Sequence, residues 1–390
     1  MNGDYQSKTH VFYSPTKVSI GLNAASQAAH EARQFGSTKV LIVTDPGVIQ
    51  ADLIKPVELS FRTEHVGYIV YDGVEPEPPS GVIDRGAAIF KSEGCDLVLG
   101  LGGGSSLDVA KGISIMAANK GKILDYCGVD QVPQKGAPLI LMPTTAGTGS
   151  EVTRVLVLTD EAQNTKNVVF TPYALASAAI IDPLLTVSMP PTVTADTGMD
   201  AMVHAIETYV SMSATVFSDI LAERAIALIA ENLPVAWAKG SNTRARSNMS
   251  LAATLAGMAF GSGGLGAVHA LAYPLGTEYH MTHGRTNAIM LPHVMRYNLS
   301  GDPVKYARIA DLMGKDTEGY APLEAAELAV EAVEDLLDTV SVSCRIKDYG
   351  IPAADLPKLV AGGMKQARLF VANPRDLNED DVVSIYKEAY

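Results

Sequence analysis

Four short apolar runs alternate with helix-length segments in the first half of the chain, and this order strongly limits its possible folds. The runs are rich in β-branched residues and show no polar alternation, as expected for parallel strands covered on both faces. They are KVLIVT (39–44), VGYIVY (66–71), DLVLGL (96–101) and PLILM (138–142). Helical patterns such as 79–92 and 107–118 lie between them. This order predicts a doubly wound, Rossmann-like α/β domain.

The pattern changes near residue 186. Two further strand-like pieces, 154–159 and 178–181, precede the turn-rich sequence SMPPT at 188–192. From residue 194 helical patterns dominate, and strand signals nearly vanish. We therefore expect an α/β domain at 1–186 and an all-α domain at 187–390.

Composition excludes several classes of protein. A chain of 390 residues with 47% hydrophobic residues can bury a large core without disulfides. A net charge of −13, with no basic run interleaved with aromatic residues, disfavours a nucleic-acid partner. The three cysteines show no CxxC spacing, so neither disulfides nor a thiolate zinc site are expected. We see no signal-peptide pattern and no apolar stretch of about 18 residues, and we expect a cytoplasmic protein without a membrane partner.

A glycine-rich segment, LVLGLGGGSSLDVAK (97–111), lies where a predicted strand ends and a helix begins. Glycines there let backbone N–H groups approach a phosphate, which the helix N-terminus favours electrostatically. Ser105 and Asp108 have the spacing of a capping box, which predicts that they fix the helix start. The segment is neither GxGxxG nor a Walker motif, and by itself it also suits an ordinary tight turn.

Two more features lie at predicted strand ends, where open α/β sheets bind ligands. The sequence PTTAGTGSEVT (143–153) crowds hydroxyls and glycines after the fourth apolar run. Together with the glycine-rich segment it suits a pyrophosphate and a nicotinamide ribose. Asp45 ends the first run and could accept hydrogen bonds from an adenosine ribose diol, which would favour NAD over NADP. It could equally be a helix N-cap before Pro46.

Aspartate and histidine residues form a candidate metal site in the second half. Asp200 and His204 are four residues apart on a predicted helix and so share a face. Their neighbours are apolar, and an unpaired buried carboxylate would cost several kcal/mol. With His269 and His283 they offer one carboxylate and three imidazoles, a set suited to Fe²⁺ or Zn²⁺ with an open position. Alternatively, the pair is a helix cap, a surface pair or a satisfied core group. We expect His293 only to cap or pack a helix.

Four ordered motifs carry a family resemblance that extends from about Val11 to the C-terminus. They are GGGSSLDVAK, PTTAGTGSEVT, GMDAMVHAIETYVS, and VHALAYPLG followed by HGRTNAIMLPHV. Together they resemble those of the iron-containing (group III) alcohol dehydrogenases. The resemblance implies a dehydroquinate-synthase-like architecture, with an NAD-binding first domain and a metal-binding second domain.

By position, the resemblance also implies site residues. The implied ligands of Fe²⁺, with Zn²⁺ possible, are Asp200, His204, His269 and His283. The implied NAD contacts are Asp45, Gly102, Gly103, Gly104, Ser105, Ser106, Asp108, Thr144, Thr145, Thr148, Thr153, Lys166 and Leu185. Phe260 matches a substrate-pocket residue near the nicotinamide.

Two positions depart from the family pattern. Many members have a histidine four residues after the third ligand, where this chain has Tyr273. A proton would then reach the substrate oxygen through water, Tyr273 or His280. In the family signature DGVxPNP, Glu77 replaces the asparagine. Hydrogen bonding to the cofactor at this edge is therefore open.

The implied activity is NAD(H)-linked alcohol dehydrogenation or aldehyde reduction on a small primary alcohol or aldehyde. The metal would polarise the substrate oxygen. Arg285, close to His283, could contact the acidic group of a sulfo- or carboxy-aldehyde, or it could be a solvated or interface arginine. A dehydroquinate-synthase-like lyase is a further alternative, but it would need several cationic groups where we find only Arg285. We expect a homodimer or a larger homo-oligomer.

Overall fold

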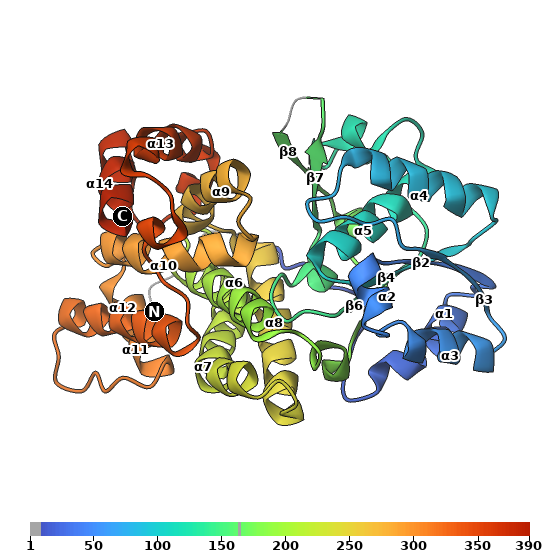
Figure 1. Cartoon of the computed structure of the whole chain (residues 1–390), viewed down its shortest axis with the longest axis horizontal. Coiled ribbons are helices and arrows are strands. Elements are labelled where there is room, and N and C mark those ends of the chain that lie inside the picture. Colours follow the sequence, from blue (N-terminus) through green and yellow to red (C-terminus); the bar gives the residue numbers. More distant parts are fainter. Residues whose placement is uncertain (1–8, 163–164) are drawn as a thin grey trace. The chain divides into compact units, whose positions relative to one another are not determined.

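The computed structural model describes residues 9–162 and 165–390. The chain divides into two compact units. One unit is Tyr13–Ser188, and the other comprises Met189–Tyr390 together with residues 9–12. Each is described separately (Figure 1).

The unit Tyr13–Ser188 is built on a parallel sheet with the strand order β1-β9-β6-β4-β2-β3. The strands, in sheet order, are β1 (Val18–Ile20), β9 (Ala178–Ile181), β6 (Leu139–Pro143), β4 (Leu97–Gly102), β2 (Lys39–Val43) and β3 (Gly67–Tyr71). The four apolar runs of the sequence are thus β2, β3, β4 and β6. The predicted Rossmann-like parallel sheet is confirmed.

Helices cover both faces of this sheet, which explains why its strands are apolar throughout. The helices are α1 (Ala28–Gln34), α2 (Pro46–Gln50), α3 (Lys55–Thr63), α4 (Ser80–Ser92) and α5 (Gly104–Ala118). In β2, Val40 and Ile42 pack in one core with α1 and α3. Leu41 and Val43 point to the opposite face and pack in a second core with α4 and α5. This alternation buries successive side chains of the same strand on two faces.

A second, smaller sheet departs from the prediction. The segment predicted at 154–159 forms β7 (Val155–Asp160), which pairs antiparallel with β8 (Thr165–Phe170). Strand β8 also pairs with β5 (Gly128–Val129), so β7 lies outside the six-stranded sheet. Strand β8 has no strong signal in the sequence because most of its residues are only partly buried.

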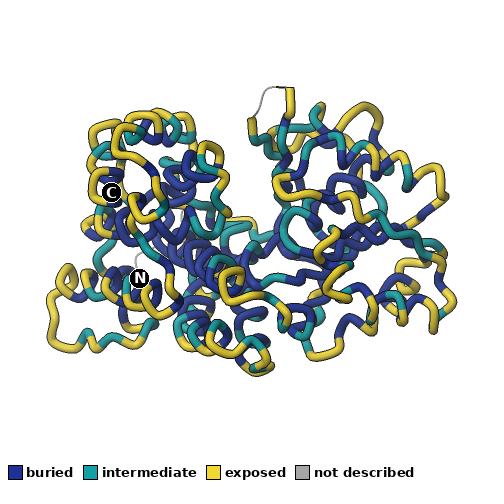
Figure 2. The backbone as a smooth tube through the Cα atoms, in the orientation of Figure 1, coloured by how far each residue is buried: buried dark blue, intermediate teal, exposed yellow. Residues whose placement is uncertain are grey.

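The second unit is helical, as predicted, and the residues described there contain no strand. Its α-helices are α6 (Pro191–Val210), α7 (Val216–Ala238), α8 (Thr243–Gly263), α9 (Ala267–Tyr279), α10 (His283–Asn298), α11 (Pro303–Leu312), α12 (Pro322–Thr339), α13 (Leu356–Met364) and α14 (Glu379–Ala389). Helix α6 packs against α7, α8 and α10 and is buried along most of its length (Figure 2). It forms the centre of the unit.

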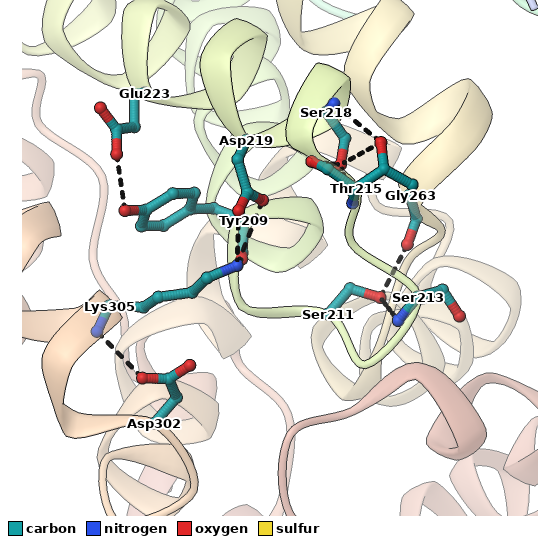
Figure 3. A network of polar contacts seen from close by, with 10 residues as sticks. All are labelled: Tyr209, Ser211, Ser213, Thr215, Ser218, Asp219, Glu223, Gly263, Asp302 and Lys305. Atoms are coloured by element: carbon teal, nitrogen blue, oxygen red, sulfur yellow. Dashed lines mark hydrogen bonds and ion pairs between the residues drawn. The ribbon is translucent and has the colours of Figure 1, made fainter. Parts of the chain in front are cut away.

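Polar contacts fix the C-terminal end of α6 (Figure 3). The Tyr209 hydroxyl donates to Glu223 Oε1 on α7 at 2.7 Å. Lys305 of α11 donates to the Tyr209 carbonyl and pairs with Asp219 at 3.0 Å. Ser211 Oγ donates to the Gly263 carbonyl at the end of α8, at 2.7 Å. These bonds hold α6 in place on three neighbouring helices.

No single helix among the described residues is long and apolar enough to cross a membrane. Helices α8 and α9 meet the length and composition criteria only as a pair, which is bent by 109°.

Candidate metal centre and cofactor site

Three helices bring the predicted metal ligands together. Asp200 and His204 come from the middle of α6, His269 from the first turn of α9, and His283 is the first residue of α10. One ligand atom from each of these four residues lies within 4.8 Å of the other three. Asp200, His204 and His269 are buried, whereas the His283 side chain is 39% exposed. The four side chains therefore form one cluster with a partly open side.

Glu207, which the sequence reasoning missed, orients one of these histidines. Its Oε2 lies 2.6 Å from His269 Nδ1, and its Oε1 accepts a hydrogen bond from the Val268 backbone N–H at 2.6 Å. A carboxylate on Nδ1 places the imidazole proton there, so Nε2 presents its lone pair to the cluster. Asp200, His204 and Glu207 follow the helical spacing of positions 0, 4 and 7. That shared face of α6 is a signal that could have revealed Glu207.

Asn287 is a second residue that the sequence reasoning missed. It is fully buried one turn after His283, and its Nδ2 donates to Asp200 Oδ1 at 2.8 Å. The same nitrogen lies 3.2 Å from His269 Nε2 and 3.1 Å from His283 Nε2. Its buried Oδ1 has no hydrogen-bond partner among the described residues. The Asn287 amide nitrogen is thus within hydrogen-bond distance of one side-chain atom from each of Asp200, His269 and His283.

The electrostatics of the cluster favour an anionic Asp200. Burial by itself acts to raise the pKa of this carboxyl group. The His204, His283 and His269 imidazoles and the Asn287 amide act in the opposite direction, and the pKa is lowered from its usual value. One carboxylate and three imidazoles are donors that suit Fe²⁺ or Zn²⁺, so this residue set fits such an ion.

We expect Glu207→Gln to weaken Zn²⁺ or Fe²⁺ affinity by about 10–100-fold, because the partner that orients His269 loses its charge. Competition with a chelator of known affinity measures this change. Glu223→Gln is the matched control, since it removes a carboxylate that accepts from Tyr209 and, among the described residues, makes no hydrogen bond or ion pair with the four cluster residues. If Glu207→Gln bound the ion within 2-fold of the wild type, Glu207 would not orient His269 for metal binding.

Phe260 and Tyr273 lie beside the cluster. The Phe260 ring stacks on His204 with 4.5 Å between ring centroids, and the Tyr273 ring is 5.8 Å from that of His283. Burial raises the pKa of Tyr273 above the ordinary tyrosine value, which itself lies well above neutral pH.

His280 and Arg285 are placed differently. His280 is exposed at the end of α9 in a left-handed conformation, with φ 55°, and no contact with the four cluster residues is found among the described residues. Arg285 pairs with Asp196, with 2.6 Å between Nε and Oδ1. His293 packs within α10, as expected, with Nε2 2.8 Å from the Cys344 carbonyl oxygen.

In the other unit, the predicted cofactor residues other than Lys166 and Leu185 gather near the carboxyl ends of β2, β4 and β6. The Thr144 backbone N–H donates to the Gly102 carbonyl at 2.9 Å. A Cβ on Gly102 would lie 2.6 Å from Ser106 Cβ, and one on Gly104 would lie 2.9 Å from Thr148 Cγ2. A side chain at position 102 would therefore collide with the first turn of α5, and one at position 104 would collide with the Thr-rich loop.

The start of α5 corrects one prediction. Gly103 is the N-cap, and no side chain caps this helix, so the proposed Ser105–Asp108 capping box is wrong. Ser105 lies inside the first turn. The Asp108 carboxylate instead accepts bonds from Ser150 Oγ at 2.6 Å and from the Val157 backbone N–H at 2.9 Å. Asp108 therefore bonds to residues distant in the sequence and not to the start of its own helix.

Asp45 serves as an N-cap and also makes a second contact. Its Oδ1 accepts from the Val48 backbone N–H at 3.1 Å at the start of α2, and its Oδ2 accepts from Ser106 Oγ at 2.8 Å. The capping role is therefore present. The second bond ties the end of β2 to the first turn of α5, next to the glycines.

Lys111 is a positioning residue that the sequence reasoning missed. It is fully buried on α5, and its Nζ donates to Ser150 Oγ at 2.8 Å, to Thr153 Oγ1 at 3.2 Å and to the Val155 carbonyl at 2.6 Å. Burial lowers its pKa, against the effect of the Asp108 carboxylate. These bonds hold the Thr-rich loop against α5.

Two further predicted cofactor residues have other neighbours. Lys166 Nζ donates to Glu77 Oε1 at 2.5 Å. The residue that replaces the family asparagine is thus paired with a predicted cofactor lysine. Leu185 is buried in a 3₁₀ turn, Pro183–Thr186.

Comparisons with known proteins agree with this arrangement. The model of iron-containing alcohol dehydrogenases matches residues 15–183, and that of the C-terminal part of the same family matches residues 194–390. A 1,3-propanediol dehydrogenase of Citrobacter freundii is 41% identical over 95% of this chain and 96% of its own length. The chain therefore belongs to the iron-containing alcohol dehydrogenase family.

Solved structures extend the likeness to the whole fold. That of a 1,3-propanediol oxidoreductase is 39% identical, with a TM-score of 0.96 over 98% of this chain and all of that one. That of a sulfoacetaldehyde reductase from Bifidobacterium kashiwanohense, in complex with NAD⁺, is 28% identical, with a TM-score of 0.90 over 98% and 99% of the two chains. The predicted family, fold and enzyme class, an oxidoreductase that interconverts alcohols and aldehydes, are confirmed. The predicted cofactors, NAD(H) and iron, agree with these findings.

Proposed function

We propose that this chain is an NAD(H)-linked alcohol dehydrogenase and aldehyde reductase for small primary alcohols and aldehydes. The convergence of Asp200, His204, His269 and His283 carries the proposal. These four side chains would hold the divalent metal, which supplies a Lewis acid for the substrate oxygen. The remaining work of the protein is to bind and orient the reactants and to move a proton.

The unit Tyr13–Ser188 would bind NAD(H) at the carboxyl ends of its strands. The Gly102–Ser106 segment offers backbone N–H groups at the start of α5, where a pyrophosphate is favoured. Thr144, Thr145, Thr148 and Thr153 place hydroxyls in the adjacent loop, which Lys111 holds in position. Asp108, Lys166 and Leu185 complete the proposed set.

Proton transfer to or from the substrate oxygen is assigned to Tyr273. Its ring is near that of His283, and a tyrosine hydroxyl is protonated at neutral pH and can donate a proton. His280 is the weaker candidate because it is exposed and has no contact with the cluster among the described residues. Phe260, stacked on His204, would form an apolar wall beside the reacting atoms.

A neutral substrate is favoured over an anionic one. The Arg285 guanidinium already pairs with Asp196 and also donates to the Tyr349 hydroxyl at 3.4 Å. An arginine with its charge balanced in this way is a poor receptor for a sulfonate or carboxylate. The likeness to a sulfoacetaldehyde reductase keeps the anionic aldehyde as the second candidate.

A panel of alcohols and aldehydes, assayed by NADH absorbance after loading with Fe²⁺ or Zn²⁺, tests this proposal. We expect turnover of short neutral alcohols and aldehydes, with a lower kcat/KM for their sulfo- and carboxy-analogues. A preference for the anionic aldehydes would favour the second candidate. Net NADH formation from a simple alcohol excludes the lyase, whereas no turnover of any member would contradict the proposal.

We expect Asp45→Ala to relax the preference for NAD over NADP by about 10-fold or more. The variant loses a carboxylate that would bond to the ribose diol and repel a 2′-phosphate, and bonds to a charged group contribute about 1.5–3 kcal/mol. The preference is measured as the ratio of kcat/KM for NAD to kcat/KM for NADP. Asp45→Asn, which keeps an acceptor for Val48, should show the same direction without loss of the cap.

The control for this experiment is Asp52→Ala, which removes an exposed carboxylate that pairs with Lys55. If the ratio of kcat/KM for NAD and NADP stayed at the wild-type value in both Asp45 variants, Asp45 would not contact the cofactor.

We also propose that the protein is cytoplasmic and forms at least a homodimer. Strand β1 is an edge strand, and its Val18 and Ile20 are exposed. An unpaired apolar edge of this kind favours association with another chain. Light scattering on the purified protein tests the oligomer, and a monomer at micromolar concentration would contradict it.

A further inference from the structure

Asp196 binds Thr282 and Arg285, which lie one residue before and two residues after the predicted ligand His283. It lies one turn before Asp200 on α6, so the two carboxylates share a face of this helix. Thr282 Oγ1 donates to Asp196 Oδ2 at 2.7 Å, and Arg285 Nε donates to Asp196 Oδ1 at 2.6 Å. One carboxylate therefore engages side chains on both sides of His283.

The backbone between these two residues lies directly on α6. A Cβ on Gly284 would come within 2.2 Å of the Asp196 carbonyl oxygen, so only glycine allows this approach. Thr282 is the N-cap residue of α10, yet its side chain does not cap that helix. Its hydroxyl instead bonds across to α6, which shows that the start of α10 is anchored to α6.

Arg285 is anchored on its far side as well. Its Nη1 donates to the Tyr349 hydroxyl at 3.4 Å, and that hydroxyl donates to the Ser343 carbonyl at 2.8 Å. The guanidinium therefore links α6 to the segment after α12. Because the guanidinium is bonded to Asp196 on one side and to Tyr349 on the other, Asp196 helps to hold Arg285 in place.

His283 is the cluster residue for which such an anchor matters most. Its side chain is 39% exposed, against 4% for Asp200 and 2% for His269. His269 is oriented by the buried Glu207, whereas His283 stands at the very start of its helix. Ordering a free backbone segment costs conformational entropy, so a ligand on an unfixed helix start binds an ion less tightly.

We propose that Asp196, with Thr282 and Arg285, forms a clamp that positions His283 and thereby slows the release of the bound metal ion. The inference rests on the proposed function, in which His283 is a metal ligand. It assigns Asp196 a positioning role and assigns Arg285 to the protein framework rather than to an acidic substrate group.

The test is a double-mutant cycle on Asp196 and Arg285 in the Zn²⁺-loaded full-length protein. The rate at which a colorimetric chelator captures the released ion is measured for Asp196→Asn, Arg285→Ala and the double variant. We expect each single variant to release Zn²⁺ about 10-fold faster or more, within the range for residues that orient metal ligands. The double variant should be only slightly faster than either, because both changes open the same clamp.

Asp355→Asn is the control for a general loosening of this region. Asp355 accepts a bond from the Tyr279 hydroxyl at 2.7 Å, at the other end of the loop between α9 and α10. We expect its release rate within 2-fold of the wild type. If Asp355→Asn and Asp196→Asn released Zn²⁺ equally faster than the wild type, the clamp would be overturned. The same holds if Asp196→Asn and Arg285→Ala both released Zn²⁺ at the wild-type rate. Circular dichroism identifies any variant that fails to fold, and Asp196→Glu, which keeps the charge, should then retain part of the slow release.

The outcomes also separate the inference from the proposed function. If the wild type bound no Zn²⁺, or if His283→Ala left Zn²⁺ affinity unchanged, the proposed metal site itself would be wrong. If Arg285→Ala kept slow release but lost kcat/KM for anionic aldehydes alone, Arg285 would be a substrate receptor and the clamp would be refuted.

Discussion

Replacement of His269 by alanine should abolish alcohol oxidation while leaving NADH affinity within a few-fold of the wild type. The variant loses one of the three cluster imidazoles and leaves the buried Glu207 carboxylate without its imidazole partner. Metal catalysis supplies several kcal/mol, so we expect kcat/KM to fall by about 10³-fold or more. NADH affinity should persist because the proposed cofactor residues belong to the other unit.

His293→Ala is the matched control for this prediction. His293 is also a buried histidine of this unit, with contacts to Cys344 and Glu388 and none with the cluster residues among the described residues. Its variant should retain most of the activity. Wild-type turnover by metal-free His269→Ala protein would refute the mechanism.

Lys111→Met should destabilise the protein by about 3 kcal/mol and weaken NADH binding. The change removes a buried ammonium group that joins Asp108, Ser150, Thr153 and the Val155 carbonyl, and breaking a buried network leaves its partners uncompensated. Methionine keeps most of the apolar stem, so the loss reports the polar contacts. Urea unfolding followed by circular dichroism gives the stability, and fluorescence titration gives NADH affinity.

Lys39→Met provides the comparison. Lys39 pairs with Glu93 at 3.1 Å on the surface, where such a pair contributes about 0–1 kcal/mol. If Lys111→Met lost no more free energy of unfolding than Lys39→Met, Lys111 would not stabilise the cofactor loops.

The main sheet could be predicted from sequence because its strands are buried on two faces and read as unbroken apolar runs. Strand β8 was missed because its burial is partial and its partners are β5 and β7, outside that sheet. The capping box at Ser105 failed for a related reason. A local motif predicts only local bonds, whereas Asp108 bonds to Ser150 and Val157, more than 40 residues later.

The four cluster residues could be named from the motifs, but their supporting residues could not all be found in this way. Glu207 lies on the same face of α6 as Asp200 and His204, so helical spacing carried a signal for it. The pairing of Asp196 with Arg285 joins residues 89 positions apart and depends on how α10 meets α6. Only the tertiary structure reveals that contact, and it changes the interpretation of Arg285.

The convergence of four side chains on one dication is tested most directly by anomalous diffraction from crystals loaded with Zn²⁺ or Fe²⁺. We expect one strong peak, about 2.0–2.2 Å from an Asp200 oxygen and from a nitrogen of each of His204, His269 and His283. A peak bound elsewhere, or loaded crystals in which these four side chains share no ion, would contradict it.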